Sequence, residues 1–246
     1  MTIESAEELA GMRRVGALVG ETLRSLREQV RPGIATGTLD EHAAAIFARH
    51  GATSAPASTY GFPGTICISV NEEVVHGVPG PRVLREGDLV TLDVTPELDG
   101  FFADAAITVP VGRPTPAGRR LLGAAGACLR DALAVATSGA RLSAIGRATE
   151  RTAHRHGTRP FAELAGHGIG RGLHEEPSVF NVDMPRLRTR LHDGLVLAVE
   201  PMLTAGSTRL ETRDDGWTIA TADGSLSVHV EHTIVVRDRR PAVLTG

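Results

Sequence analysis

The sequence predicts an α/β (α+β) fold made of two halves of similar design, each with two helices followed by strands. Three observations predict it: the helix–helix–strand order occurs twice, matching residues recur at a nearly constant spacing, and no low-complexity linker separates the halves. A chain of 246 residues is long enough for one large unit of this kind. We therefore expect a single domain over residues 1–246, whose halves, about 1–112 and 113–246, share one core.

Two capping patterns predict the helices of the first half. Ser5 followed by Glu8 is a capping box, in which a hydroxyl and a carboxylate satisfy free N–H groups of the first turn. Thr38 with Glu41 repeats the pattern. The two helices are expected to end where a glycine follows, at Arg31-Pro32-Gly33 and at His50-Gly51.

Short β-rich runs follow the second helix, over residues 65–70, 89–94 and 102–109. Between the last two, Asp99-Gly100 is a strong signal for a two-residue hairpin turn, because both positions of that turn need positive φ angles. These two runs are therefore expected to pair as an antiparallel hairpin.

The second half repeats this order. Thr115-Pro116 opens a third helix that is expected to end near Ser138-Gly139. A fourth helix is expected from Ser143 to His156, before Gly157. Strands are expected to resume over 195–199 and 229–236.

Residue spacing supports an internal duplication. At a shift of 106, Gly33 and His50-Gly51 match Gly139 and His156-Gly157. At a shift of 107, Leu84, Glu86-Gly87, Val90 and Asp93 match Leu191, Asp193-Gly194, Leu197 and Glu200. Two small halves related in this way are expected to share a cleft at their junction, where ligand sites tend to lie.

Composition excludes several classes of function. Hydrophobic residues make up 41% and charged residues 22%, as in globular proteins, and the net charge of −3 argues against a nucleic-acid-binding surface. Neither a signal peptide nor a run of about 20 apolar residues is present. The two cysteines, Cys67 and Cys128, form no disulfide framework. We expect a cytoplasmic protein with no membrane contact.

Acidic residues in apolar strands are the main functional signal. With Asp99-Gly100 as the turn, residues whose numbers sum to 199 pair, so Asp93 lies opposite Ala106. Asp104 is then on the same face, diagonally about 7–8 Å away at the backbone. At that distance the two carboxylates can converge on one ion or on a pair.

The second half supplies two more such acids. Glu200 follows the apolar run 195–199 and matches Asp93 in the repeat, and Glu231 lies between the apolar runs 227–230 and 233–236. One acid of this kind could simply face solvent at a strand end. Since a buried carboxylate is costly unless it is paired or bound to a metal, all four together favour a metal site.

Histidines complete the predicted site. His167 and His174 lie in the glycine-rich segment 166–177, where His167 is placed to bind metal and His174 to donate a proton to substrate. His76 is a third candidate. A hydrogen-bonded structural histidine is the alternative for each. The other histidines are expected to be structural, with the last two flanking a ligand strand: His42, His50, His154, His156, His192, His229 and His232.

Other chemistries have little support. Ser178 and Pro177 break the two-histidine zinc-protease pattern that would begin at His174. Gly166-His-Gly-Ile-Gly lacks the surrounding βαβ pattern of a dinucleotide loop. Neither cysteine has zinc-finger spacing, and no Gly-x-Ser-x-Gly motif is present.

Over nearly its whole length the chain resembles the bacterial type I methionine aminopeptidases. The segments that carry the resemblance are Cys67–Gly77, Gly87–Val94, Gly100–Asp104, Gly166–Pro177, Val199–Met202, Asp215–Trp217 and Val230–Val236. The resemblance implies the pita-bread fold, a pseudo-twofold α/β domain with a central curved antiparallel sheet. It also implies removal of the initiator methionine from nascent proteins, in most cases before a small second residue.

The resemblance also implies roles for individual residues. Asp93 would chelate one of two divalent metal ions (Co, Mn, Fe or Zn), while Asp104 and Glu231 would bridge both ions. His167 and Glu200 would complete the shell of the second ion, and Glu200 would also carry protons. The catalytic His76 and His174 would contact the substrate and the tetrahedral intermediate. The implied partners are N-terminal peptides and, transiently, the ribosome, and the implied state is a monomer.

The methionine pocket departs from the family pattern. Thr59-Tyr60 stands where family members typically have Tyr-His, and Leu173 stands where they have Phe. Phe62, Cys67 and Trp217 are therefore expected to contribute more of the side-chain packing.

Two rival functions remain. One is an Xaa-Pro aminopeptidase or dipeptidase of the same fold; those enzymes usually carry a large extra N-terminal domain, and the segment 166–177 resembles the methionine type more closely. The other is a pita-bread binding module without catalysis, which the complete set of ligand positions argues against.

Overall fold

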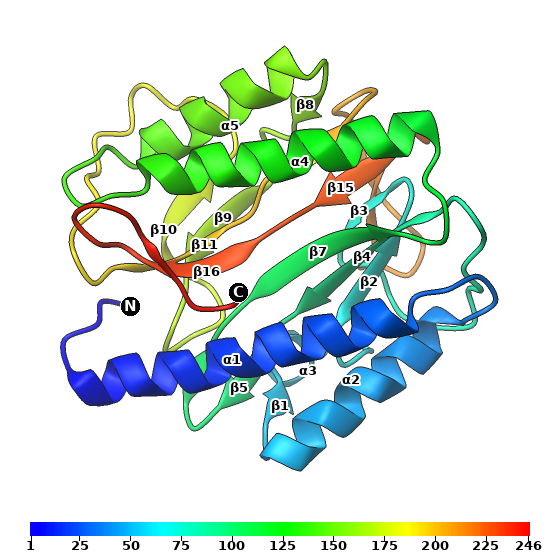
Figure 1. Cartoon of the computed structure of the whole chain (residues 1–246), viewed down its shortest axis with the longest axis horizontal. Helices are drawn as coiled ribbons and strands as arrows, with labels where there is room; N and C mark the ends of the chain where they lie inside the picture. The colour runs from blue at the N-terminus through cyan, green and yellow to red at the C-terminus, as the bar shows by residue number, and fades with distance from the viewer.

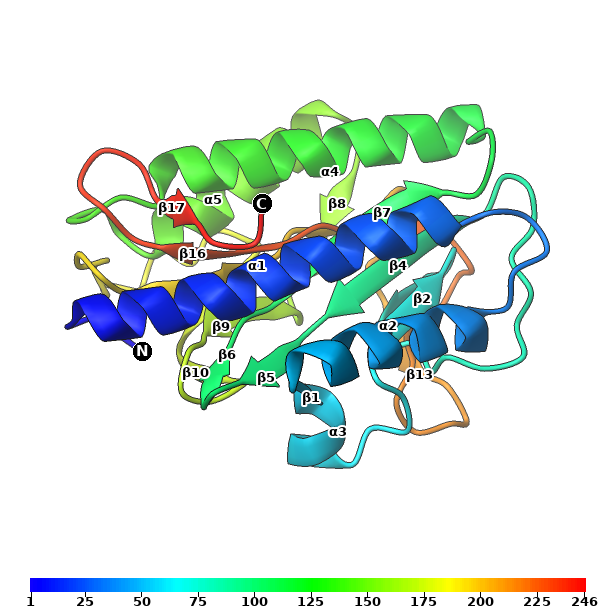
Figure 2. The same ribbon diagram turned by 60° about the horizontal axis from the view of Figure 1, so that its bottom comes forward.

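Four long helices lie on one side of a curved layer of antiparallel strands in the computed structural model, which describes residues 1–246 (Figure 1). The same arrangement is seen after rotation in Figure 2, where the first-half pair and the second-half pair lie one above the other. The helices are α1 (Ala6–Gln29), α2 (Thr36–His50), the short α3 (Ala55–Tyr60), α4 (Pro116–Val135) and α5 (Ser143–Arg155). No helix combines the length and the apolar character needed to cross a bilayer.

The strands form two main sheets, one from each half. The first has the order β2-β4-β7, with β2 (Cys67–Val70), β4 (Leu89–Val94) and β7 (Ala105–Pro110). The second has the order β10-β9-β11-β16-β17, with β9 (Ala165–Gly168), β10 (Glu175–Phe180), β11 (Val196–Val199), β16 (His232–Val235) and β17 (Ala242–Val243). Every strand pair is antiparallel.

Three small sheets extend these layers. The first contains β1 (Thr53–Ser54), β5 (Pro96–Leu98) and β6 (Phe101–Phe102). The second contains β3 (Glu73–Val75), β13 (Leu210–Thr212) and β14 (Ile219–Thr221). The third contains β8 (Arg159–Pro160), β12 (Met202–Thr204) and β15 (Ser227–His229). Sequence patterns predicted few of these strands, because two or three residues are too short for a visible periodicity.

Helix starts illustrate where local patterns hold. The Ser5 hydroxyl accepts the Glu8 N–H at 3.1 Å as predicted, although the Glu8 carboxylate accepts the N–H of Glu4 instead of that of Ser5. The Thr38 capping box is wrong: α2 begins at Thr36 without a side-chain cap. Its free N–H groups are satisfied by a distant loop, since Gly37 donates to the Gly80 carbonyl at 2.8 Å. A tertiary contact has replaced the local cap.

The predicted hairpin is confirmed. Asp93 pairs with Ala106 and Glu97 pairs with Phe102, both on the sum of 199. Asp99 and Gly100 have φ angles of 53° and 75°, as a two-residue turn with two left-handed positions requires. The turn fixes which face of β4 and β7 each side chain occupies.

The two halves meet along β7 and the segment 229–233, where two threonines hold the partner backbone reciprocally. The Thr108 hydroxyl donates to the His229 carbonyl at 2.8 Å and accepts the His229 N–H at 2.9 Å. The Thr233 hydroxyl likewise donates to the Asp104 carbonyl at 2.7 Å and accepts the Asp104 N–H at 2.9 Å. Between these contacts, Glu231 N–H donates to the Ala106 carbonyl at 2.9 Å.

The cores lie between the helices and the sheets, on one side of this junction. The largest buried cluster packs α1 and α2 against β2, β4 and β7. A second cluster packs α4 and α5 against β11 and β16. With the helices covering one face, the opposite face of the junction is free to carry polar side chains.

Candidate metal centre

The predicted ligands converge at the junction of the halves. Asp93 lies in β4, Asp104 just before β7, His167 in β9, Glu200 directly after β11 and Glu231 between β15 and β16. The last four are nearly inaccessible, with exposures of 7%, 8%, 8% and 2%. Buried carboxylates from both sheets thus face one another.

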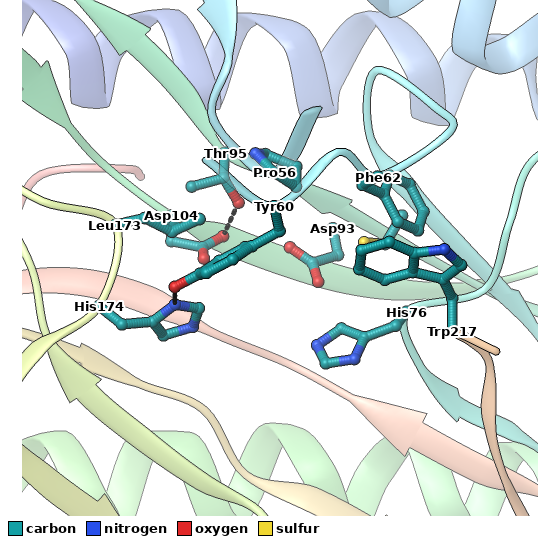
Figure 3. Close-up of a pocket in the computed structure, with 11 residues that line it drawn as sticks. Pro56, Tyr60, Phe62, His76, Asp93, Thr95, Asp104, Leu173, His174 and Trp217 are labelled. Carbon is teal, nitrogen blue, oxygen red and sulfur yellow. Dashed lines mark hydrogen bonds between the residues drawn. The ribbon is translucent and has the colours of Figure 1, made fainter. Parts of the chain in front are cut away.

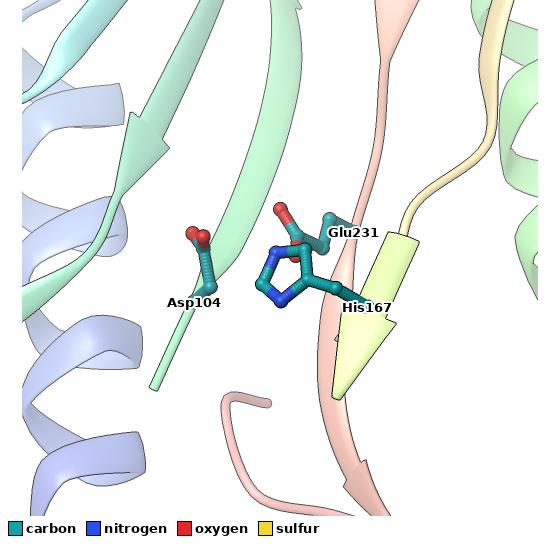
Figure 4. A group of neighbouring side chains, drawn as sticks. All are labelled: Asp104, His167 and Glu231. Carbon is teal, nitrogen blue, oxygen red and sulfur yellow. The ribbon is translucent and has the colours of Figure 1, made fainter. Parts of the chain in front are cut away.

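Distances place these side chains within reach of common ions. Ligand atoms of Asp104, His167 and Glu231 all lie within 4.8 Å of one another, and Figure 4 shows the three side chains facing one space. His167 Nε2 lies 3.5 Å from Glu200 Oε1. Asp93 lies beside Asp104, whose negative charge acts on it.

The electrostatics of the group favour a bound cation. Burial raises the pKa of Asp104 to about 6, against the opposing hydrogen bond from the Thr95 hydroxyl at 2.7 Å. Burial, and next the charge of Asp104, raise the pKa values of Asp93, Glu200 and Glu231 well above the usual range for carboxyls. Without a cation these acids cannot all be ionised, because like charges in a poorly solvated space repel one another.

The histidines of the group are neutral and can offer lone pairs. Burial lowers the pKa of His167 to about 4, and the backbone carbonyl of Gly168 lies 2.8 Å from its Nδ1. That contact leaves Nε2 on the carboxylate side, as in many metal-binding histidines. Carboxylates with imidazole suit divalent ions such as Mn, Fe, Co and Zn.

One member of the cluster was not predicted as a site residue. His229 was expected to be structural, yet its Nε2 lies 3.5 Å from a carboxylate oxygen of Glu200 and 3.5 Å from one of Glu231. His229 is 2% exposed. Burial is also the main cause that lowers its pKa, to about 3.

Unsatisfied atoms support the fit of a metal to this cluster. Both ring nitrogens of His229 and Oε1 of Glu231 are buried without a hydrogen-bond partner. Buried polar atoms are rarely left unpaired, and a cation beside Glu231 would satisfy its Oε1 and could accept the lone pair of His229 Nε2.

The position of His229 matches that of Asp104 in the sequence, but the match can be recognised only with the structure. Asp104 and Thr108 match His229 and Thr233 at a shift of 125, which exceeds the shift of 107 because the segment with β13 and β14 intervenes. His229 therefore occupies in the second half the position that Asp104 has in the first. Only the reciprocal threonine contacts make this match visible.

A pocket adjoins the acidic cluster (Figure 3). Phe62 and Trp217 form one wall, with ring centroids 5.4 Å apart in an edge-to-face arrangement at 89°. Thr59 is exposed and does not line the pocket. The lining residues are Pro56, Tyr60, Phe62, Cys67, His76, Asp93, Thr95, Asp104, Leu173, His174 and Trp217. Among these, Pro56 and Thr95 were not predicted, whereas Tyr60 was expected near the pocket without an assigned role.

His76 and His174 border both the pocket and the acidic cluster. The ring centroids of His174 and His167 are 4.2 Å apart. His174 Nδ1 lies 2.7 Å from the Tyr60 hydroxyl oxygen. His76 has a φ of 58°, an uncommon conformation for a residue with a side chain, of the kind that clusters at functional sites.

Comparison with known proteins agrees with this geometry. Residues 10–238 match the model of metallopeptidase family M24. The chain is 40% identical to a methionine aminopeptidase of Clostridium perfringens, over 99% of this chain and 98% of the relative. It is 38% identical to methionine aminopeptidase 1 of Bacillus subtilis, over 98% of each chain. The chain belongs to the methionine aminopeptidases of family M24.

Solved structures place the fold in the same family. The crystal structure of methionine aminopeptidase from Thermotoga maritima has a TM-score of 0.96 at 34% identity, over 100% of this chain and 99% of that one. A prolidase from Pyrococcus furiosus has a TM-score of 0.80 at 18% identity, over 100% of this chain and 65% of that one. The prolidase shares the pita-bread fold, whereas the methionine aminopeptidases match in sequence as well.

Proposed function

We propose that this chain removes the N-terminal methionine from newly made proteins, with two divalent metal ions held by Asp93, Asp104, His167, Glu200 and Glu231. The observation that carries the proposal is the convergence of buried carboxylates and neutral imidazole nitrogen from both halves within 4.8 Å. Membership of a metallopeptidase family supports the same interpretation.

We propose the ligand roles that the family resemblance implies, and the positions of the residues support them. Asp104 and Glu231 lie on the two central strand segments that face each other across the junction, so they are proposed to bridge the ions. Asp93 extends the first-half side of the cluster, while His167 and Glu200 extend the second-half side. When bound, two such ions lower the pKa of a shared water and polarise the scissile carbonyl.

The surrounding residues are proposed to position the substrate and move protons. Glu200, whose pKa is raised by burial, is suited to accept a proton from the attacking water and pass it to the leaving amine. His174 is proposed to donate a hydrogen bond to the developing negative charge on the carbonyl oxygen. His76, at the border of the pocket and the cluster, is proposed to contact the substrate backbone.

The pocket is proposed to bind the methionine side chain. Phe62, Cys67, Leu173 and Trp217 supply apolar surface, and thioether sulfur makes favourable contacts with aromatic rings. Thr59, which was predicted as a substrate contact, is exposed outside this pocket, so no contact with the methionine side chain is proposed for it. A small second residue is proposed to be preferred.

The wider setting is also part of the proposal. We infer a cytoplasmic location with transient contact to the ribosome, since the proposed substrates are newly made chains. The protein is proposed to act as a monomer, because the predicted ligands and the pocket all come from one chain.

Metal-dependent release of methionine from short peptides tests the function. The metal-free protein would be titrated with Mn, Co, Fe or Zn ions and assayed on Met-Ala, Met-Pro and Ala-Pro peptides. We expect metal-dependent release of Met from peptides with a small second residue. Turnover of Ala-Pro alone would indicate an Xaa-Pro peptidase, and metal uptake without turnover would indicate a binding module.

A further inference from the structure

Tyr60 joins the two halves across the mouth of the pocket. It is the last residue of α3 in the first half, and its hydroxyl oxygen lies 2.7 Å from Nδ1 of His174 in the second half (Figure 3). The two rings are 5.6 Å apart between centroids. Although 51% of Tyr60 is exposed, its polar end is directed at the pocket histidine and not into solvent.

The backbone before and after Tyr60 is held firmly. Ser54 caps α3 through the Ala57 N–H at 3.3 Å and donates to the Thr65 carbonyl at 2.7 Å. Gly61 closes the helix with a φ of 74° and donates to the Ala57 carbonyl at 3.0 Å. A short helix fixed at both ends gives the Tyr60 side chain a defined direction.

The contact has a consequence for the proton of His174. A neutral imidazole carries one proton, on either Nδ1 or Nε2, and the partner of one ring nitrogen decides which. The ring nitrogen that accepts a hydrogen bond cannot be the one that carries this proton. A phenol hydroxyl is a hydrogen-bond donor and can donate its proton to Nδ1.

We propose that Tyr60 is a positioning residue, whose hydroxyl donates to His174 Nδ1 and so keeps the His174 proton on Nε2. Nε2 makes no hydrogen bond within the protein, and the carboxylates of Asp93 and Asp104 line the same pocket. An N–H at Nε2 is favoured beside acceptors and is the donor that a developing oxyanion needs. In the opposite tautomer Nε2 would carry a lone pair and could not donate.

Tyr60 stands in the Thr59-Tyr60 pair, where members of the family typically have Tyr-His. The inference rests on the proposed role of His174 as a hydrogen-bond donor to substrate, and its experiment separates the two ideas.

Steady-state kinetics of Tyr60→Phe give the first test, because this change removes only the hydroxyl. We expect kcat to fall roughly three- to tenfold, the effect of one neutral hydrogen bond, with KM within about twofold of the original. Ser58→Ala, which removes a hydroxyl from the same helix turn, is the matched control and should leave kcat unchanged. In a His174→Ala background, Tyr60→Phe should cause no further loss, because its effect acts through His174.

The ¹⁵N NMR spectrum of the metal-free protein gives a readout independent of turnover. We expect His174 to show a protonated Nε2 and an unprotonated Nδ1, and Tyr60→Phe to shift this balance towards the other tautomer. A proton on Nδ1 in the original protein, or a spectrum and kcat unaffected by Tyr60→Phe, would overturn the inference. An unchanged kcat in His174→Ala would instead overturn the proposed role of His174.

Discussion

Asp104 and His229 occupy equivalent positions in the two halves but differ in chemistry. Each is held at its backbone N–H and carbonyl by a threonine hydroxyl of the opposite half. One position carries a carboxylate and the other a neutral imidazole, and both side chains face the same cluster. The two halves therefore keep the same backbone geometry at a pseudo-twofold junction, although the side chain at the equivalent position differs.

The halves also differ in how they build the site. The first half supplies Asp93 and Asp104 from one hairpin whose turn fixes their register. The second half supplies His167, Glu200 and Glu231 from separate segments that meet only in the folded sheet. The first arrangement is local in sequence, while the second depends on long-range pairing.

Of the variants considered for the two halves, Asp104→Asn should have the largest effect on activity. The neutral amide loses the charge proposed to bridge the ions, so activity should fall by roughly a thousandfold or more, as expected for the loss of several kcal/mol of transition-state stabilisation. The fold should remain, because a buried charge is removed. Peptide assays with circular dichroism measure both.

The matched control is Asp99→Asn, which makes the same change in the exposed turn of the same hairpin, where the Asp99 side chain is 63% exposed. This control should keep full activity. Near-normal turnover of Asp104→Asn with metal bound would show that Asp104 does not bridge the ions.

Removal of the metal should lower the stability of the protein by an amount that depends on pH, because acids and imidazoles from both halves then lose their proposed partner. The pKa of Asp104 is about 6 in the folded protein, above its ordinary 3.8, so its contribution to the stability of the metal-free protein is lost as pH rises through about 6. The pKa of His167 is about 4, below its ordinary 6.5, so its contribution is lost as pH falls below 6.5.

Added metal should therefore stabilise more strongly near pH 8, where it replaces protons on the acids without competing with protonated imidazole. At a free metal concentration about 1,000 times the Kd, the gain should be about 4 kcal/mol. Thermal melts with and without metal at about pH 5.5 and pH 8 measure it. An equal shift in Tm at both values would contradict the buried acidic cluster as the binding site.

His229→Gln tests the equivalent position in the second half and should have a smaller effect, on metal affinity. Glutamine keeps a donor of similar size but lacks an imidazole lone pair, so metal affinity should weaken roughly 10- to 100-fold, the range for groups that support a metal site. Chelator competition measures the affinity. His42→Gln is the control and should bind metal normally. His42 lies far from the ligands in the sequence, and its ring is hydrogen-bonded to Ser25. Unchanged affinity in His229→Gln would mean that this imidazole only fills space.

The threonine contacts should give the smallest effect. Thr108→Val and Thr233→Val each leave a buried N–H and a carbonyl unpaired, at a cost of roughly 1–2 kcal/mol in the free energy of unfolding. The Thr108 hydroxyl also lies 2.7 Å from the buried hydroxyl of Thr91, so Thr108→Val is measured in a Thr91→Val background. In that background the costs of the two variants should be similar if the junction is pseudo-symmetric, as measured by denaturant unfolding of the metal-free variants. A much larger loss for one variant would show that the two contacts are not equivalent.

Local chemistry explains which sequence predictions hold. A two-residue turn at Asp99-Gly100 allows only one pairing register for the two strands, and in that register Asp93 lies opposite Ala106. The capping pattern at Ser5 also holds because its partners are only a few residues away. The Thr38 pattern does not, since the loop at Gly80 satisfies the same N–H groups from a distance.

The amino-acid sequence was enough to predict the helix pairs, the hairpin and the acids that meet at the junction, because propensity, turn geometry and the cost of burying charge act within short segments. Tertiary structure alone decided that His229 faces Glu200 and Glu231 and that Tyr60 reaches His174. Those contacts join residues far apart in the chain. No local pattern encodes them, because they exist only once both sheets have met at the junction.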